Sequence, residues 1–350
     1  MSQTLRVPVL DSRKKPLMPT TAVRARLLLK SGKAKPYWNH LGIFCIILTK
    51  EVEPNNQIIA AAVDPGSKFE AFSVVGIQDT IVNAMTYAPT HIKEAVEVRR
   101  NMRRARRHRN LRRRPARFNN RLRNTNRLPP STKARWQSKL NILKQLSKVI
   151  PISDVVVEDV RASPKKHARR WNVNFSPIEV GKQWFYQSIK DLGFKLWLKN
   201  GWDTKTLRSS FGFKKTSQKA KVCWESHVVD SWVMAASITG AKNPCKHMVL
   251  WTPLWFHRRQ LHVFQAAKGG VRKLYGGTRS MGLTRGTLVQ SKWGLCYVGG
   301  TSKGKVSLHS LTTGKRVCQN ADPVDLLVKT KLTIRRQAIP LTPKGASILA

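Results

Sequence analysis

Two apolar runs separated by a short turn form the most clearly patterned stretch of this sequence. The first run covers residues 58–63 and ends in a single carboxylate, Asp64. Pro65 and Gly66 turn the chain, and a second apolar run covers residues 71–75. Strands that are buried on both faces show continuous apolar runs instead of alternation. The pattern therefore predicts a hairpin of two buried strands, with one acid at its turn.

The residues before this hairpin have the pattern of a small α/β unit. Its expected elements are strands at 5–10 and 41–48, a turn at 16–19, and a helix that Thr20 or Thr21 caps and that continues to Lys30 before a stop at Gly32.

After the hairpin, helices and strands alternate, and some of them carry acids. We expect strands at 80–87, 152–157 and 195–198, helices at 131–149, 184–192 and 226–238, and basic loops at 161–178 and 211–221. The second of these strands leads directly into Glu158 and Asp159. His227 and Asp230 lie near the start of the last helix.

The composition changes from Thr239 onward, where Gly, Thr, Ser, Val and basic residues alternate. Short strands are expected at 287–289, 295–298, 305–308, 316–318 and 326–332. Such closely spaced strands predict a small β-barrel. The chain beyond about 335 is expected to be loose.

An arginine-rich stretch in mid-chain predicts a helix that does not pack on the protein. At 100° per residue its arginines surround the helix and leave no apolar stripe. A helix from Ile92 to Arg114 would be roughly 34 Å long. The alternative is a disordered basic tail, but structured segments are expected on both sides, so we predict a helix bound to nucleic acid. Its contacts are expected to include Arg99, Arg100, Arg103, Arg104, Arg106, Arg107, Arg109, Arg112, Arg113, Arg114 and Arg117.

The charge of the chain also indicates a nucleic-acid partner. The 65 Lys and Arg residues outnumber 18 Asp and Glu, and the formal net charge is +47. A duplex of about 20 base pairs carries about 40 phosphates, which is the same scale. No long amphipathic helix favours a membrane surface, and no apolar run is long enough to span a bilayer. The five cysteines form no CxxC pair, so a reducing cytoplasm is expected.

Four acids lie where buried strands or an apolar helix would carry them inward: Asp64, Glu158, Asp159 and Asp230. Carboxylates that converge at strand ends can hold two divalent ions, of which one activates water and the other stabilises the leaving oxygen. His227 could act as a general base or orient the water. Alternatively, Asp64 could be a hydrogen-bonded turn residue and His227 a capping or core histidine. The order of these elements predicts an RNase H-like fold with Mg²⁺, or Mn²⁺ in its place, as the cofactor.

The acid-bearing segments resemble the three parts of a split RuvC nuclease domain. The motifs are Val63-Asp64-Pro-Gly-Ser-Lys68, Val155-Val-Val-Glu158 and His227-Val-Val-Asp230. An Arg-rich bridge helix between the first two parts, and an N-terminal segment containing Pro16-Leu-Met-Pro19, are similar to those of IscB proteins. Only residues 159–226 lie between the second and third parts, and they contain no recognisable HNH nuclease. The chain therefore resembles the HNH-lacking IsrB group of this family.

This resemblance implies a division of the chain into seven segments. They are a PLMP domain at 1–55, RuvC part I at 56–90, the bridge helix at 91–130, RuvC part II at 131–160, a linker in place of HNH at 161–222, RuvC part III at 223–245, and a C-terminal domain at 246–350 that reads a target-adjacent motif.

The resemblance also implies an activity and its partners. A long guide-bearing ωRNA would direct a monomeric protein to double-stranded DNA, and the RuvC site of Asp64, Glu158 and Asp230, assisted by His227, would nick the displaced strand. Arg272, Arg279 and Arg285 are candidates for reading the adjacent motif. The role of Lys68 and the choice between Glu158 and Asp159 stay open. The alternatives are a transposase or junction resolvase that acts without RNA, and a non-catalytic RNA-binding protein.

Overall fold

A computed structural model provides the structure of this protein. It describes residues 6–66, 68–89, 91–108, 128–159, 177–218, 220–245, 247–253, 264–265, 270–271, 279–302, 304–330 and 332–338. Within these ranges, no helix is both long enough and apolar enough to cross a membrane.

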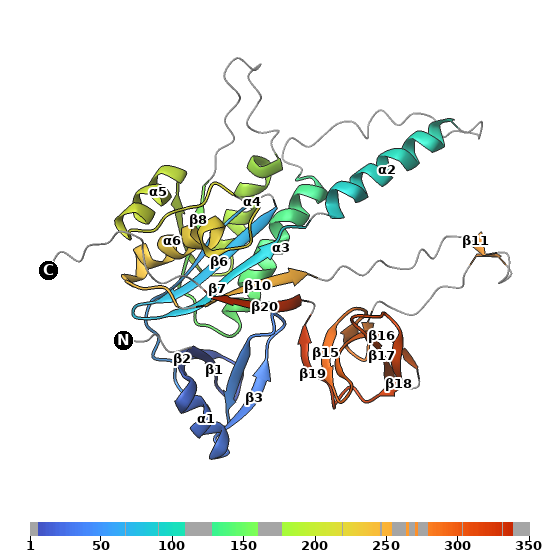
Figure 1. Ribbon diagram of the computed structural model, residues 1–350, viewed down its shortest axis with the longest axis horizontal. Helices are drawn as coiled ribbons and strands as arrows, with labels where there is room; N and C mark the ends of the chain where they lie inside the picture. Colours follow the sequence, from blue (N-terminus) through green and yellow to red (C-terminus); the bar gives the residue numbers. More distant parts are fainter. Residues whose placement is uncertain are drawn as a thin grey trace.

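A seven-stranded mixed sheet forms the centre of the molecule (Figure 1). Its order is β20-β10-β7-β6-β5-β8-β9. The predicted hairpin is β5 and β6, which pair antiparallel, and β7 continues the meander. On the other side of β5, β8 and then β9 add in parallel. The strands are β5 (Ile59–Asp64), β6 (Phe69–Gly76), β7 (Thr80–Tyr87), β8 (Asp154–Glu158), β9 (Lys195–Lys199), β10 (His247–Pro253) and β20 (Leu332–Ala338).

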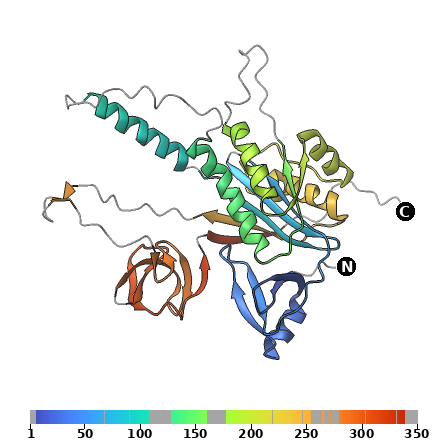
Figure 2. The same cartoon turned by 180° about the vertical axis from the view of Figure 1, so that it is seen from behind.

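The order and directions of β7-β6-β5-β8-β9 match the RNase H-like core expected from the sequence. Helices cover both faces of this core, which explains why β5 shows no alternation. Ile59, Ala61 and Val63 pack in one core cluster with α3 (Pro130–Ser147) and α4 (Pro177–Lys190). Ala60 and Ala62 pack in another with α6 (Val229–Thr239). Figure 2 shows α3 and α4 crossing one face of the sheet.

The close contact between α3 and α4 depends on a glycine. Trp136 of α3 and Phe185 of α4 lie with their ring centroids 4.9 Å apart. A Cβ atom at Gly181 of α4 would stand 2.0 Å from Cδ1 of Trp136. No side chain fits at that distance, so glycine at this position allows the two helices to pack together.

The arginine-rich helix α2 (His91–His108) projects from the body of the molecule (Figure 1). Ile92 is buried at its start, whereas the side chains from Glu97 to Ala105 are all exposed. This agrees with the prediction that α2 has no face for docking on the core. The predicted continuation of this helix to Arg114 lies outside the described residues.

The N-terminal unit is a four-stranded sheet in the order β2-β1-β4-β3 with one helix. Its elements are β1 (Arg6–Leu10), β2 (Pro16–Thr21), α1 (Ala22–Lys30), β3 (Ala34–Trp38) and β4 (Phe44–Leu48). The helix begins as predicted, because the side chain of Thr21 accepts a hydrogen bond from the backbone N–H of Arg24.

Two strands of this unit differ from the prediction. Residues 16–19 lie in β2 and not in a turn, and β3, which contains Pro36, was not predicted at all. Both strands are at the edges of the sheet, where proline is tolerated because its missing N–H removes no ladder hydrogen bond. The prolines in these two segments are therefore the reason why the sequence did not predict the two edge strands.

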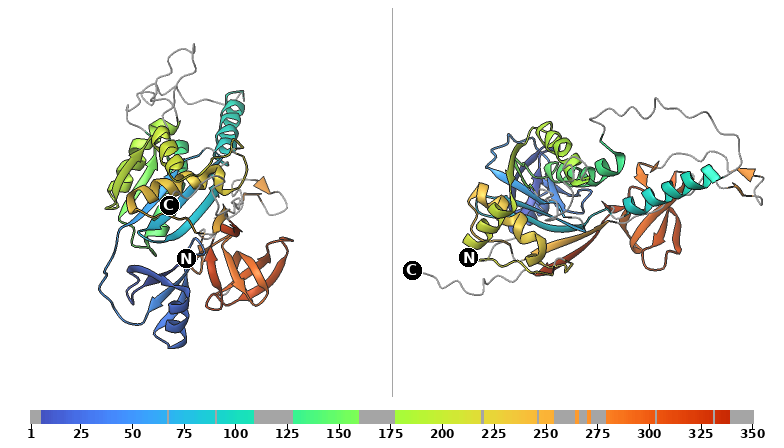
Figure 3. Two further views of the ribbon diagram at one scale, coloured as in Figure 1. Left: turned by 60° about the vertical axis from the view of Figure 1, so that its left-hand side comes forward. Right: turned by 90° about the horizontal axis from the view of Figure 1, so that it is seen from above.

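The C-terminal part contains a five-stranded antiparallel sheet in the order β18-β17-β16-β15-β19. Its strands are β15 (Leu288–Ser291), β16 (Gly294–Ser302), β17 (Lys305–Ser310), β18 (Arg316–Ala321) and β19 (Leu327–Thr330). Short two-residue strands, β11 (Phe264–Gln265) with β12 (Gly270–Val271) and β13 (Arg279–Ser280) with β14 (Leu283–Thr284), form two further ladders. The five strands curl round a small core of their own (Figure 3). The predicted barrel is not closed within the described residues, since β18 and β19 are edge strands.

Two strands within the segment 246–350, neither of them predicted, belong to the central sheet. β10 pairs in parallel with β7, and β20 pairs antiparallel with β10 along seven residues. Trp251 and Met248 of β10 are buried in the central core. The chain thus leaves the central sheet after β10 and returns with β20, which continues to Ala338, past the position at about 335 where a loose end was expected.

Candidate active site

Two acids emerge side by side at one edge of the central sheet. β5 and β8 are parallel neighbours with Val63 opposite Val157, so the next residues, Asp64 and Glu158, lie at the same level. Both side chains are buried and the two carboxyl groups hydrogen-bond to each other. Since Val63 and Val157 pack toward α3 and α4, alternation turns Asp64 and Glu158 to the face that α6 covers.

The third acid and the histidine reach the same edge from the helix above it. Asp230 is buried in the first turn of α6. His227 lies in the single π-helical turn η3 (Trp224–Val228) that precedes α6. Its Nδ1 atom is 3.2 Å from Oδ2 of Asp64. Such π-turns are rare and occur often at functional sites. The structure therefore brings together all four residues that the sequence analysis selected for catalysis.

Two cations that the sequence analysis missed also belong to this cluster. Arg208 of α5 (Gly201–Ser210) forms an ion pair with Oδ1 of Asp230. Lys215, in the loop after α5, forms an ion pair with Oδ2 of the same residue. The positive charge of Lys215 also acts on Asp64 and Glu158. The sequence contains no signal for these contacts beyond the basic character of the loop at 211–221.

The electrostatics of the cluster shift the pKa values of its two strand acids, Asp64 and Glu158, in opposite directions. Burial raises the pKa of Glu158 to about 8, and the charge of Asp64 and the hydrogen bond to it act in the same direction. Burial would also raise the pKa of Asp64, but the hydrogen bond from His227 and the charge of Lys215 outweigh it and lower that pKa. Of the two strand acids, Glu158 is therefore the more readily protonated.

The side chains of this cluster are of the chemical types that bind divalent cations. Carboxylate oxygens are the ligands that Mg²⁺ and Mn²⁺ prefer, and three buried carboxyl groups gather in this cluster. As the described side chains stand, however, no group of three or more His, Cys, Asp or Glu residues is arranged around a metal position. Lys215 and Arg208 each contact one oxygen of Asp230, so a metal ion that approaches Asp230 would meet two cations already paired with it.

The neighbour of Glu158 faces the opposite side of the sheet. Oδ1 of Asp159 accepts hydrogen bonds from Lys182, at 2.7 Å, and from Tyr186, at 3.0 Å, both on α4. The alternation along a strand is the physical reason. The geometry therefore places Glu158, and not Asp159, beside Asp64.

Two further acids are buried in the central sheet. Glu70 of β6 forms an ion pair of 2.6 Å with Lys139 of α3. Asp154 is buried at the start of β8 and accepts a hydrogen bond from Trp197. Asp154 lies at the end of β8 opposite to Glu158. A charged residue within a continuous apolar run is the sequence signal that could have identified Glu70.

The predicted nucleic-acid contacts are only partly described. Arg99, Arg100, Arg103 and Arg104 are exposed on α2, and Arg285 is exposed after β14. Arg106 and Arg107 lie within α2 and Arg279 within β13. Arg109, Arg112, Arg113, Arg114, Arg117 and Arg272 lie outside the described residues. Lys68 is exposed, with its Nζ atom 5.5 Å from the centroid of the Phe69 ring.

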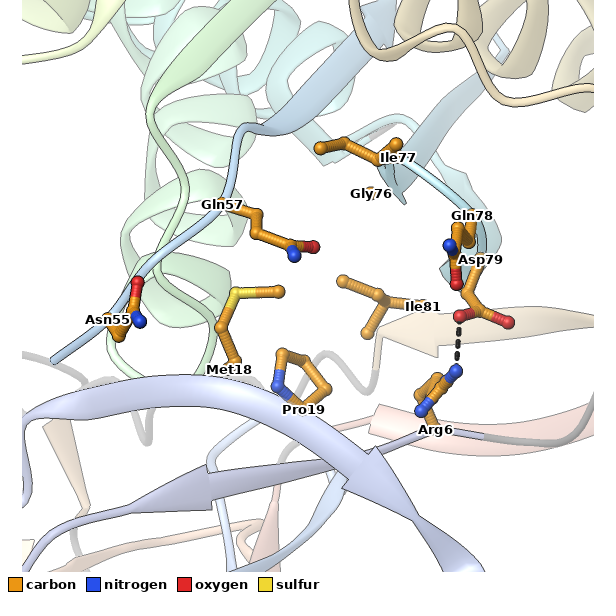
Figure 4. Close-up of a pocket in the computed structure, with 10 residues that line it drawn as sticks. All are labelled: Arg6, Met18, Pro19, Asn55, Gln57, Gly76, Ile77, Gln78, Asp79 and Ile81. Atoms are coloured by element: carbon orange, nitrogen blue, oxygen red, sulfur yellow. Dashed lines mark hydrogen bonds and ion pairs between the residues drawn. The ribbon is translucent and has the colours of Figure 1, made fainter.

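A cavity of about 390 Å³ lies at the other end of the central sheet (Figure 4). It is lined by residues before β5, by the β6–β7 turn and by β2, and the ion pair of Arg6 and Asp79, at 2.5 Å, closes one side. Gln57 and Met18 point into it. Because Asp64 is at the opposite end of β5, this cavity is separate from the acid cluster.

Comparisons with known proteins give a partial family match. A family model described as "RRXRR protein" matches residues 7–171. No curated protein matches the chain. Two solved structures are similar. The first is "T. thermophilus RuvC in complex with Holliday junction substrate", with 13% sequence identity, a TM-score of 0.26, and coverage of 51% of this chain and 90% of that chain. The second is "Thermus thermophilus RuvC structure", with 12% sequence identity, a TM-score of 0.25, and coverage of 52% of this chain and 97% of that chain. At such low TM-scores, the fold assignment depends on the strand order described above.

Proposed function

We propose that this chain is an RNA-guided DNA endonuclease that nicks one strand, with Asp64, Glu158 and Asp230 as its metal-binding acids. The observation that supports this best is the convergence of these acids, with His227, at one edge of an RNase H-like sheet. When bound, a pair of Mg²⁺ ions would activate the attacking water and stabilise the leaving oxygen, and Mn²⁺ would substitute.

His227 is suited to handle the proton of the attacking water. With its Nδ1–H donated to Asp64, the imidazole presents Nε2 as its acceptor nitrogen. The Asp64 carboxylate fixes the orientation of the ring, as a carboxylate does for a general base. Phe69, with its centroid 6.0 Å from that of His227, packs on the ring from the strand side.

The nucleic-acid partners are inferred from charge and from the arginine helix. The net charge of +47 needs a polyanionic partner, and α2 presents arginines that do not contact the core. Together with the IsrB-like motifs, this supports an ωRNA whose guide pairs with one DNA strand. We propose that the C-terminal part reads the adjacent motif, with Arg272, Arg279 and Arg285 as candidate contacts. The displaced strand is then single and can enter the acid cluster.

The test uses a duplex whose two strands carry different labels, incubated with protein, guide RNA and Mg²⁺. We expect one nick, on the displaced strand, and loss of nicking with Asp64→Asn, Glu158→Gln or Asp230→Asn. These losses should not add, because each variant disables the same metal site. The matched control is Asp159→Asn, a carboxylate next to Glu158 that faces α4 and should leave nicking intact.

Three results would overturn the proposal. Cutting of a four-way DNA junction without RNA would favour a resolvase. A double-strand break as the main product would require a second nuclease site. Absence of metal-dependent cleavage with every guide, together with tight RNA binding, would favour a non-catalytic RNA-binding protein.

A further inference from the structure

An ammonium group is paired with one acid of the candidate active site and acts on the other two through its charge. Lys215 forms an ion pair with Oδ2 of Asp230, and its charge also acts on Asp64 and Glu158. Its side chain is only 26% exposed. One lysine is thus paired with the acid in the first turn of α6 and lies close enough to the two strand acids for its charge to act on them.

The loop that carries Lys215 is anchored on both sides of this residue. Phe213 packs edge-on against Trp232 and Trp224, with ring centroids 5.7 Å and 6.0 Å apart. The backbone N–H of Thr216 donates a hydrogen bond of 2.9 Å to the carbonyl of Glu225. Lys215 is therefore held over the acids by packing and by backbone pairing, so its position is not that of a freely moving surface lysine.

Lys215 and Arg208 differ in how they can respond to a metal ion. Arg208 belongs to α5 and contacts Oδ1 of Asp230. Lys215 carries a compact charge on a flexible four-carbon stem, which can swing without moving its backbone. A cation placed between Asp64, Glu158 and Asp230 would repel the ammonium group, which is paired with Asp230 and interacts electrostatically with the other two acids.

We propose that Lys215 is the resident counter-cation of this acid cluster, and that a divalent metal ion must displace its ammonium group before Asp230 can act as a ligand. The inference rests on the proposed function, because it requires the acids to bind metal. In the metal-free protein, Lys215 stabilises the three carboxyl groups, and on metal binding it leaves them. It is thus a positioning residue that exchanges with the cofactor.

The test measures Mn²⁺ binding to the full-length, nucleic-acid-free protein by the electron paramagnetic resonance signal of free Mn²⁺. Mn²⁺ binding at the acid cluster is defined as the difference between the binding of the wild-type protein and that of the Asp64→Asn variant. We expect Lys215→Gln to tighten this binding at least about threefold, the scale of one partly exposed charge pair. The same variant should lower the thermal midpoint of the metal-free protein, and saturating Mn²⁺ should remove most of that difference.

The neighbouring lysine supplies the matched control. Lys214 is exposed and lies one residue away, so Lys214→Gln makes the same charge change and should alter neither the affinity nor the metal-free midpoint. Lys215→Arg keeps the charge and should leave the affinity within about twofold of wild type. It also serves as the folded comparison if Lys215→Gln is too unstable to purify.

The outcomes separate this inference from the proposed function. Asp64-dependent Mn²⁺ binding that Lys215→Gln leaves unchanged or weakens would overturn the displacement of Lys215 and leave the nuclease proposal standing. A lack of Asp64-dependent binding in wild type and in every Lys215 variant would overturn both. Tightening by Lys214→Gln to the same degree would show that only the net charge of the loop matters, and would also overturn the role of Lys215.

Discussion

Replacing Lys139 by Met should destabilise the fold, because it leaves a buried carboxylate without its partner. Lys139 and Glu70 are 6% and 1% exposed and lie 2.6 Å apart across the interface of α3 and β6. The other oxygen of Glu70, Oε2, has no hydrogen-bond partner in the described part of the chain. Methionine retains much of the packing of the lysine stem but supplies no charge.

The size of the effect follows from the ability of Glu70 to bind a proton. Keeping a glutamate protonated at pH 7 costs about 1.36 kcal/mol for each pH unit above its usual pKa of about 4.3, or roughly 3.7 kcal/mol in total. This is an upper limit, because burial already raises the pKa of Glu70 in the presence of Lys139. We therefore expect a loss of about 2–4 kcal/mol at pH 7, near the range for broken buried ion pairs.

The pH dependence gives this prediction its sharpest form. Without Lys139, the folded-state pKa of Glu70 rises further above its unfolded value. The folded variant then binds the proton more tightly than the unfolded chain, so its stability falls as pH rises above about 4.3, by up to about 1.36 kcal/mol per unit. The difference from wild type should consequently shrink as the pH is lowered from 7 to 5.

Urea unfolding followed by tryptophan fluorescence at several pH values would measure this difference. Lys144→Met, on the same helix and half-buried, controls for the loss of a lysine. The double variant Lys139→Met with Glu70→Met should recover most of the loss, since a buried ion pair can often be replaced by apolar residues. A loss of unfolding free energy below about 1 kcal/mol at pH 7, or a loss that does not change with pH, would show that Lys139 and Glu70 do not form a buried ion pair.

Three further predictions concern other parts of the molecule. Replacing Arg99, Arg100, Arg103 and Arg104 with Ala should weaken RNA binding and reduce the slope of log K against log salt by roughly 0.7 for each lost phosphate contact; an unchanged slope would show that they do not touch phosphate. Exchanging residues 254–330 for those of a relative should change the accepted DNA flank and not the guide-matched sequence, as sequencing of cleaved target libraries would show. Gly181→Leu should lower the thermal midpoint clearly, because overpacking against Trp136 costs about 1–3 kcal/mol, whereas the surface variant Gly193→Asn should have little effect.

The sequence by itself determined the central hairpin, the strand at Thr80–Tyr87 and the strand that ends at Glu158. Each is rich in apolar and β-branched residues, and this enrichment is a local property that follows from burial on both faces of the strand. The same patterns placed Asp64 and Glu158 at strand ends and Asp230 near a helix start. Because adjacent parallel strands present equivalent ends at one edge, the sequence was sufficient to bring Asp64 and the pair Glu158 and Asp159 together, while the choice within that pair needed the structure.

Only the tertiary structure decided which distant groups complete that cluster. Arg208 and Lys215 contact Asp230 because α5 and the following loop fold back on α6, with Phe213 packed against Trp232. No periodicity of the chain encodes this contact, since it depends on the packing of aromatic side chains between separate segments.

The allocation of strands to sheets was likewise decided in three dimensions. β10 and β20 join the central sheet although a separate small sheet lies between them in sequence. Their own residues did not predict these strands, and they do not specify the partner strand. The partner is determined by where Met248 and Trp251 can be buried, and that depends on a core assembled from the whole chain.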